Sequence, residues 1–230
     1  MAPGAAVGRP SIDAKAALLI VDVQRYYLEA GSPFRAYSEA RWPGSTAYLA
    51  ARYEESLVPG IRMLREAFDA EGWPVIYLRL CGKSEDRSDL HRFFASFHRE
   101  AETAGYPGAY PLCGEPMASV ATDVAPREGD IVIDKTGFSG FREAQLEVTL
   151  RQLGVRCVTM AGLATSQCVD TTARDASDRG FSVAFAEDCL ADYTSEFHEC
   201  ALYAAMGVCG GHVHEAAWIA AAPSRLLDLS

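Results

Sequence analysis

Residues 157–180, CVTMAGLATSQCVDTTARDASDRG, place an apolar run, a turn of small residues and a helical pattern in direct succession. The run at 157–163 has the length and apolarity of a buried parallel strand. The small and hydroxyl-bearing residues 164–166 suit a tight turn and the capping of a helix. The pattern at 168–180 has helical spacing and ends on glycine, the usual helix terminator. The stretch therefore predicts a strand, a turn and a helix.

The same succession recurs on both sides of this stretch. Short apolar runs lie at AALLIVDV (16–23), PVIYLRL (74–80), DIVIDK (130–135) and SVAFAED (182–188), and helical patterns ending on glycine lie at 54–72, 142–154 and 196–207. Because parallel strands need crossover helices, the alternation predicts an α/β fold, a three-layer α/β/α sandwich around a doubly wound, mainly parallel sheet of five or six strands. We expect the strand order 3-2-1-4-5, with room for a sixth strand near GGHVHEAAW (210–218).

The length of 230 residues suits one domain with a single core, and no linker divides the chain. We expect an N-terminal tail at 1–13, a single domain at 14–223 and a C-terminal tail at 224–230. Two connections, 25–54 and 81–129, are long for a compact domain. Both leave the carboxyl ends of strands, where open α/β folds bind ligands, so we interpret them as pocket walls or lids, with subunit contacts as the alternative.

Composition narrows the class of protein. The formal net charge is −10 and no run of Lys and Arg occurs, which argues against a nucleic-acid partner. No stretch approaches the roughly 20 apolar residues of a membrane span, and the N-terminus has no secretory pattern, so we expect a cytoplasmic protein without a membrane partner. Seven cysteines form an odd set without a CxxC pair. That set favours reduced thiols over a disulfide framework.

Three reactive side chains are expected at one edge of the sheet. Asp22 ends the first strand, Lys135 ends the third, and Cys168 follows the fourth. Each alone has an ordinary structural interpretation, as a turn residue, a surface charge or a packed thiol. Together they place opposite charges beside a thiol in the first turn of a helix, where the helix dipole lowers the thiol pKa. Converging amides of the turn can form an oxyanion hole. We therefore predict that Cys168 is a nucleophile.

The sequence resembles the isochorismatase-like hydrolases, in particular their cysteine hydrolase branch. The resemblance rests on LLIVDVQ (18–24), GDIVIDKTGFSGF (129–141), GLATSQCVDTTARDASDRGFSVAFAEDCLAD (162–192) and HECALYAAMG (198–207). These motifs run in family order over most of the chain.

The resemblance implies a role for each matched residue. Asp22 is the general base, Cys168 the nucleophile, and Lys135 holds the pair electrostatically. A non-proline cis peptide is implied at Leu163–Ala164, which directs the backbone amides of Ala164 and Cys168 at the oxyanion. The implied reaction is hydrolysis of a C–N bond in a small amide, carbamoyl or ureido compound through a thioester. No cofactor and no metal is implied, and the family is commonly dimeric or tetrameric, so we expect a homodimer or homotetramer.

One position departs from the family pattern, because Gly140 stands where many relatives have Ala. We expect this change to leave the loop after Lys135 intact. The candidate substrate-pocket residues, each with an equally good structural interpretation, are Gln24, Tyr26, Tyr27, Phe34, Arg79, Phe138 and Phe141.

Four other functions stay open. A zinc-dependent nicotinamidase-like amidase would need metal ligands, for which the chain offers Asp89, His91 and His98, but Asp89 lies nine residues beyond the strand. His212 and His214 lack an evident third ligand. An isochorismatase-type vinyl ether hydrolase needs no nucleophilic thiol. The remaining alternatives are a thiol redox sensor, which lacks an adjacent resolving cysteine, and a catalytically silent interaction module.

Overall fold

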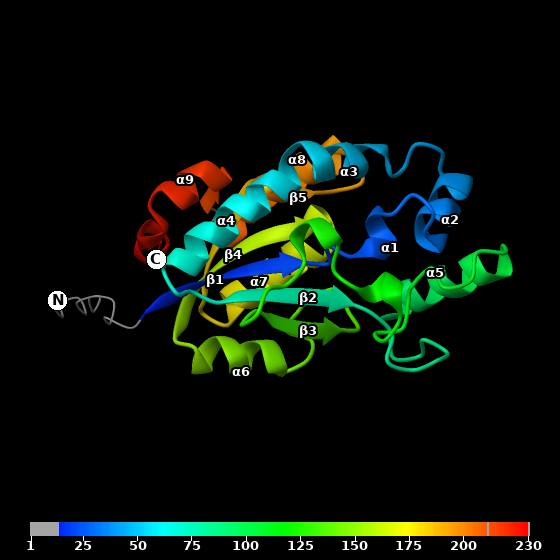
Figure 1. Ribbon diagram of the computed structural model, residues 1–230, viewed down its shortest axis with the longest axis horizontal. Helices are drawn as coiled ribbons and strands as arrows, with labels where there is room; N and C mark the ends of the chain where they lie inside the picture. Colours follow the sequence, from blue (N-terminus) through cyan, green and yellow to red (C-terminus); the bar gives the residue numbers. More distant parts are fainter. Residues whose placement is uncertain (1–13, 211, 230) are drawn as a thin grey trace, which may run out of the picture.

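The computed structural model describes residues 14–210 and 212–229, so the expected tail at 1–13 lies outside the described residues. Its centre is a parallel sheet in the order β3-β2-β1-β4-β5-β6 (Figure 1). The strands are β1 (Lys15–Val21), β2 (Val75–Leu80), β3 (Ile131–Lys135), β4 (Val155–Leu163), β5 (Ser182–Ala191) and β6 (His212–His214). The predicted strand order is confirmed, and the sixth strand forms at HVH.

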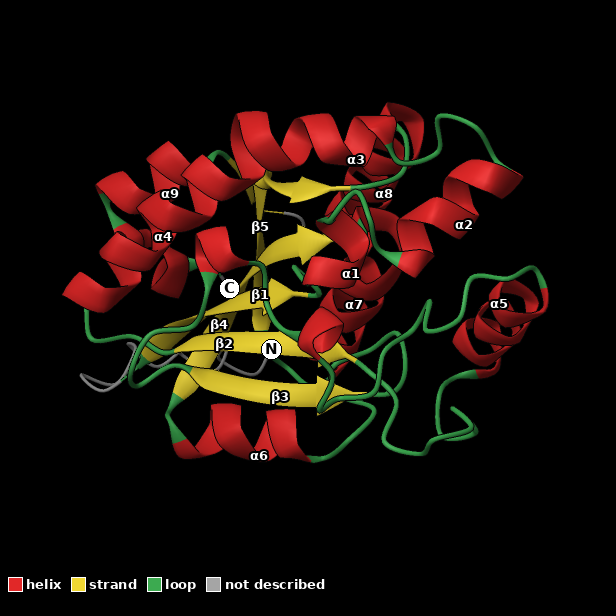
Figure 2. Ribbon diagram, turned by 45° about the vertical axis from the view of Figure 1, so that its right-hand side comes forward, coloured by secondary structure: helices red, strands yellow, loops and turns green. Residues whose placement is uncertain are grey.

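Helices cover both faces of the sheet, which confirms the three-layer sandwich. Figure 2 shows α4 and α9 on one side of the strands and α7 and α8 on the other. The bounds of these and the edge helix α6 are α4 (Val58–Ala70), α6 (Gln145–Gln152), α7 (Asp170–Asp178), α8 (Ser195–Val208) and α9 (Ala216–Ala221). The four predicted helical patterns correspond to α4, α6, α7 and α8, each of which buries one side against the domain.

The two long connections gather beyond the carboxyl ends of β1 and β2, at the right in Figure 1. They contain α1 (Arg25–Leu28), α2 (Pro33–Arg41), α3 (Ala47–Arg52), the π-helical turn η1 (Tyr53–Leu57), α5 (Arg92–Thr103) and the 3₁₀ turns η2 (Pro116–Ala118) and η3 (Thr122–Val124). The sequence predicts no helix within 81–129, yet α5 forms there. Its aromatic side chains Phe94 and Phe97 pack on Tyr110 and on α2 through Phe34.

Close packing of the central strands fixes the edge at which the reactive residues lie. Every residue of β1 from Ala16 to Val21 is buried. Gly162 of β4 is the register partner of Val21 and has φ +111°, and a Cβ there would overlap the Val21 carbonyl oxygen. Only glycine permits this approach of two backbones. The ends of β1 and β4 are therefore held next to each other.

The C-terminal segment departs from the expectation of a tail. Residues Pro223–Asp228 form the 3₁₀ helix η5, and Leu226 within it is fully buried in the core. The segment packs onto the domain through contacts with β1 and β4. In the described part of the chain, no helix is both long and apolar enough to cross a bilayer.

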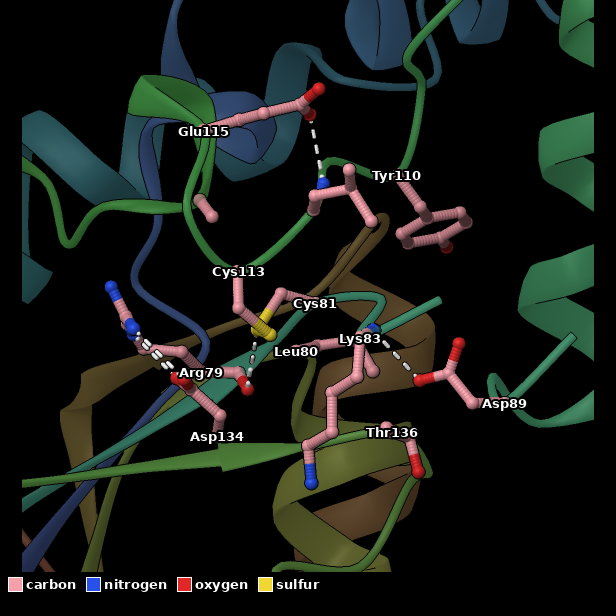
Figure 3. Close-up of a disulfide and its surroundings, with 12 residues drawn as sticks. Arg79, Leu80, Cys81, Lys83, Asp89, Tyr110, Cys113, Glu115, Asp134 and Thr136 are labelled. Atoms are coloured by element: carbon pink, nitrogen blue, oxygen red, sulfur yellow. Dashed lines mark hydrogen bonds and ion pairs between the residues drawn. A yellow bond between two sulfur atoms is a disulfide. The ribbon is translucent and has the colours of Figure 1, made fainter. Parts of the chain in front are cut away.

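A disulfide joins Cys81 to Cys113, 32 residues apart, with a Cα–Cα distance of 4.9 Å (Figure 3). The expectation of reduced thiols is wrong for these two cysteines. The loop that carries Cys113 returns beside the end of β2, where Gly82 donates its amide to Pro111 O at 3.0 Å and Cys113 donates to Gly82 O at 3.0 Å. This long-range pairing leaves no spacing signature in the sequence. The other cysteines are free thiols, at Cys157, Cys168, Cys189, Cys200 and Cys209.

Candidate active site

A buried ammonium group links the three reactive side chains. Lys135 Nζ donates to Asp22 Oδ2 at 2.8 Å, to the Gly137 carbonyl oxygen at 3.0 Å and to Cys168 Sγ at 3.2 Å. Asp22 and Lys135 are inaccessible to solvent, and Cys168 is 2% exposed. Three side chains separated by more than 30 residues along the chain thus form one cluster, with its acid, amine and thiol in mutual contact through Lys135.

The cluster forms where three strands of the sheet end. β1, β3 and β4 are parallel, so their carboxyl ends lie at one edge of the sheet. Asp22 follows β1 with φ +51°, a left-handed conformation that Asp tolerates better than most residues, and its amide still donates to Leu78 O at 2.9 Å. The turn in the backbone directs the carboxyl group from the sheet toward Lys135. Asp22 Oδ1 has no hydrogen-bond partner among the described residues, so one acceptor remains free.

Cys168 lies in the five-residue π-helical turn η4 (Thr165–Val169), which runs into α7. The peptide bond Leu163–Ala164 before this turn is cis. Asp192, at the end of β5, accepts the Ser166 amide at 2.6 Å. Its buried carboxylate therefore caps the beginning of η4 and fixes the position of the backbone that carries the thiol.

A second buried contact anchors the same turn. The Thr165 hydroxyl donates to Ala191 O at 3.1 Å and lies 2.9 Å from His198 Nδ1, and His198 Nε2 lies 3.0 Å from Glu187 Oε1. Sequence reasoning missed Asp192 and His198 as supports of the site. Their signal was weak, because an Asp after a strand and a His on a helix occur commonly without such a role.

Burial determines the protonation of the cluster. Burial raises the pKa of the Cys168 thiol well above its usual range and the Asp22 charge raises it further, while Lys135 opposes both. Burial also raises the pKa of Asp22, against the opposing effect of Lys135. For Lys135, burial lowers the pKa, but Asp22 and Cys168 raise it more. The sequence predicted that the helix end lowers the thiol pKa, whereas burial raises it in this arrangement.

A cavity of about 570 Å³ lies next to the cluster, between α2, α5 and the beginning of α8. Half of its lining residues are aromatic. The full set is Phe34, Ser38, Arg41, Trp42, Ser45, Phe93, Ser96, Phe97, Glu100, Tyr110, Gln167, Tyr193, Thr194 and Phe197. Both long connections contribute walls, as the sequence predicted.

The structure brings some of the predicted pocket residues to this cavity and leaves others elsewhere. Phe34 lines it. Tyr26 and Tyr27 are buried behind it, and their rings contact Phe34 at centroid distances of 5.7 and 4.8 Å. Phe138, half-buried, packs on Phe94 at 4.5 Å and on the cavity-lining Phe93 at 5.7 Å, without lining the cavity itself.

Three other predicted pocket residues make structural contacts away from the cavity. Gln24 donates to Leu80 O and Ala118 O and accepts from Leu80 N, so its amide is fully used. Arg79 forms a paired ion bridge with Asp134 at 2.7 and 3.0 Å beside the disulfide (Figure 3). Phe141 is buried, and the Arg179 guanidinium stacks over its ring.

The candidate metal ligands have other partners. Asp89 accepts the amides of Lys83 and Ser84, and His91 Nδ1 caps α5 by accepting the Phe93 amide at 3.2 Å. The His98 ring accepts the Tyr110 amide and faces Glu102. These contacts give each of the three side chains a local structural role. His212 and His214 stack in β6, with His214 also stacked on Trp218 at 3.7 Å.

Gly140 occupies a position without room for a side chain. An added Cβ would lie 2.5 Å from Leu78 Cδ1, and the Gly140 amide donates to Thr172 Oγ1 at 3.0 Å. Thr172 in turn donates to the Cys168 carbonyl oxygen at 2.6 Å. The loop after Lys135 is therefore tied directly to the turn that carries the thiol.

The sequence of this chain has counterparts among known proteins. A family model described as the isochorismatase domain matches residues 16–217. The ureidoacrylate amidohydrolase RutB of Variovorax paradoxus is 27% identical over 174 residues, which cover 75% of this chain and 67% of that protein.

Solved structures share the fold. A cysteine hydrolase from Pseudomonas syringae pv. phaseolicola superposes with a TM-score of 0.74 and 22% identity over 100% of both chains. The N-carbamoylsarcosine amidase of Thermoplasma acidophilum superposes with a TM-score of 0.62 and 23% identity, covering 88% of this chain and 96% of that one. With the family match extending over most of the chain, the protein belongs to the isochorismatase family of hydrolases.

Proposed function

We propose that the protein is a cysteine-dependent amidohydrolase that cleaves the C–N bond of a small amide, carbamoyl or ureido compound. The observation that carries the proposal is the Lys135 ammonium group in contact with both Asp22 and Cys168. A base, a cation and a nucleophile within contact of one another are the elements of activated-nucleophile catalysis. Relatives whose names denote amidohydrolases support the same reaction class.

The first step transfers the thiol proton and forms a bond to sulfur. Asp22 takes the proton of Cys168 as the sulfur attacks the carbonyl carbon of the substrate. Because burial and the Asp22 charge raise the pKa of the Cys168 thiol, the sulfur needs a base to become a nucleophile. Lys135 stays protonated and stabilises the negative charge as it passes between carboxylate and thiolate. The oxyanion of the tetrahedral intermediate accepts from the backbone amides of Ala164 and Cys168.

The second half of the cycle restores the enzyme. The intermediate collapses, the C–N bond breaks, and Asp22 returns its proton to the departing nitrogen, which leaves as ammonia or an amine. A thioester remains on Cys168. Asp22 then takes a proton from water, the resulting hydroxide attacks the thioester, and the carboxylic or carbamic acid leaves as the sulfur regains a proton. No organic cofactor or metal enters these steps.

The proposal extends to the protein's state in the cell. We place it as a homodimer or homotetramer of the cytoplasm that acts on a small molecule, as the sequence and the family resemblance predict. The Cys81–Cys113 disulfide argues against the cytoplasmic part of this proposal, since such bonds are uncommon in reducing compartments.

Ammonia release from a panel of carboxamides, carbamoyl compounds and ureido acids tests the proposal. The Cys168→Ala variant is expected to lose at least about 10³-fold in rate, as is usual when a covalent nucleophile is removed. Cys200→Ala is the matched control, because Cys200 is a free and exposed cysteine on α8. Release of ammonia by Cys168→Ala at the rate of the control would exclude covalent catalysis by this residue.

A further inference from the structure

The aromatic cavity is lined in part by the turn that carries the buried thiol. Gln167, which lines the cavity, is the residue directly before Cys168. Tyr193 also lines it, and its amide donates to Asp192 Oδ1 at 2.8 Å, while the other oxygen of the same carboxylate accepts the Ser166 amide of η4 at 2.6 Å. The cavity therefore adjoins the turn that carries the nucleophile. What occupies the cavity is the part of the substrate that does not react.

The wall of this cavity offers no free positive charge among the described residues. Arg41 and Glu100 are its charged residues, and they form an ion pair with each other. The Arg41 guanidinium also donates to the Tyr37 hydroxyl at 2.6 Å and lies over the Trp42 ring at 4.6 Å. Arg41 makes both its Tyr37 and its Glu100 contact through Nη1, so a carboxylate on the substrate would either share Arg41 with the like-charged Glu100 or lie unpaired against aromatic rings. Both arrangements are less favourable than an uncharged group.

The uncharged part of the wall is suited to an apolar group. Phe34, Phe97 and Tyr110 form its inner aromatic side, while Trp42, Phe93 and Phe197 lie at its exposed rim. Ser45 Oγ, buried at the wall, has no hydrogen-bond partner among the described residues and can bind one polar atom. A volume of about 570 Å³ exceeds what an amide group alone requires and falls within the range of drug-sized ligand sites.

We propose that the substrate is an uncharged carboxamide that carries an aromatic or similarly large apolar group in this cavity and no carboxylate. The inference rests on the proposed amidohydrolase function and specifies its substrate class. The apolar group lies between α2 and α5, and the amide carbon passes Gln167 and Tyr193 to reach the sulfur. Because Arg41, the cation among the described lining residues, is already paired with Glu100, selectivity comes from burial of apolar surface and from the cost of a carboxylate beside Glu100.

Binding to the Cys168→Ala protein tests this without requiring turnover. Calorimetric titration with phenylacetamide, with its 4-carboxy derivative and with maleamate compares an apolar amide with two that carry a carboxylate. We expect phenylacetamide to bind at least about tenfold more tightly than either. Equal or tighter binding of maleamate or the 4-carboxy compound would overturn the substrate class. If phenylacetamide binds but wild-type protein fails to hydrolyse any amide, the proposed function fails instead.

Two variants and a control test whether the ligand binds in this cavity. Trp42→Ala removes a rim ring and is expected to weaken phenylacetamide binding about fivefold or more. Tyr203→Ala removes an aromatic ring that is 77% exposed on α8 and outside the cavity lining, and should leave binding unchanged. Glu100→Gln frees Arg41 and is expected to strengthen binding of the 4-carboxy compound severalfold. Unchanged affinities in both Trp42→Ala and Glu100→Gln would refute the cavity as the binding site.

Discussion

Removing the disulfide is expected to destabilise the fold by an amount that depends on the length of the loop that the disulfide closes. Cys81 and Cys113 close a loop with a sequence separation of 32. For a loop of this length, the restricted entropy of the unfolded chain gives about 3–4 kcal/mol of stabilisation at 25 °C. The folded loop has other restraints, including Arg87 Nε donating to Tyr110 O at 2.9 Å. The double variant Cys81→Ser/Cys113→Ser should therefore fold to the same structure with a lower free energy of unfolding.

Urea unfolding followed by circular dichroism measures this difference. With a slope of about 2–3 kcal/mol per molar urea, the midpoint should fall by roughly 1–2 M. Reductant should shift the wild type by the same amount and leave the double variant unchanged, and Cys200→Ser, at an exposed free cysteine, should behave as wild type. Coincident midpoints of wild type and double variant in oxidising buffer would refute the reasoning.

Three further predictions concern the sheet edge. Because burial and the Asp22 charge raise the pKa of Cys168, its alkylation by iodoacetamide should increase only above the pH range of ordinary thiols, and Asp22→Asn should move that increase to lower pH; peptide mapping over a pH series measures both. Lys135→Met leaves the Asp22 carboxylate without its buried partner, so the free energy of unfolding should fall by about 3 kcal/mol and ammonia release by orders of magnitude. Gly162→Ala places a methyl group against Val21 O at a left-handed φ, and should cost more than about 4 kcal/mol, seen as loss of soluble protein or a much lower midpoint.

The sheet and its reactive edge could be predicted because both follow from simple periodic rules. Apolar runs alternate with helical patterns, and parallel strands bring their carboxyl ends together. Asp22, Lys135 and Cys168 therefore lie in contact at one edge of the sheet, as their positions at or after the strand ends predicted.

The cavity was harder to predict than the sheet, because its walls depend on long-range packing. Arg79 lies next to the correct strand end but faces Asp134 on β3, and Gln24 is saturated by backbone groups of a distant loop. Trp42 and Phe97 carry no local signal that they line a site. The thiol pKa was predicted in the wrong direction, because proximity to a helix end can be inferred from the sequence whereas full desolvation requires the packed structure.

The covalent state of Cys168 during turnover tests the central claim most directly. Wild-type protein mixed with a hydrolysable amide, quenched with acid within milliseconds and digested, should yield the peptide containing Cys168 with the added mass of the acyl group. The adduct should be absent when Asp22→Asn is treated in the same way, because that variant cannot accept the thiol proton. Steady ammonia release with Cys168 unmodified at every quench time, or with the acyl group on another residue, would contradict the account.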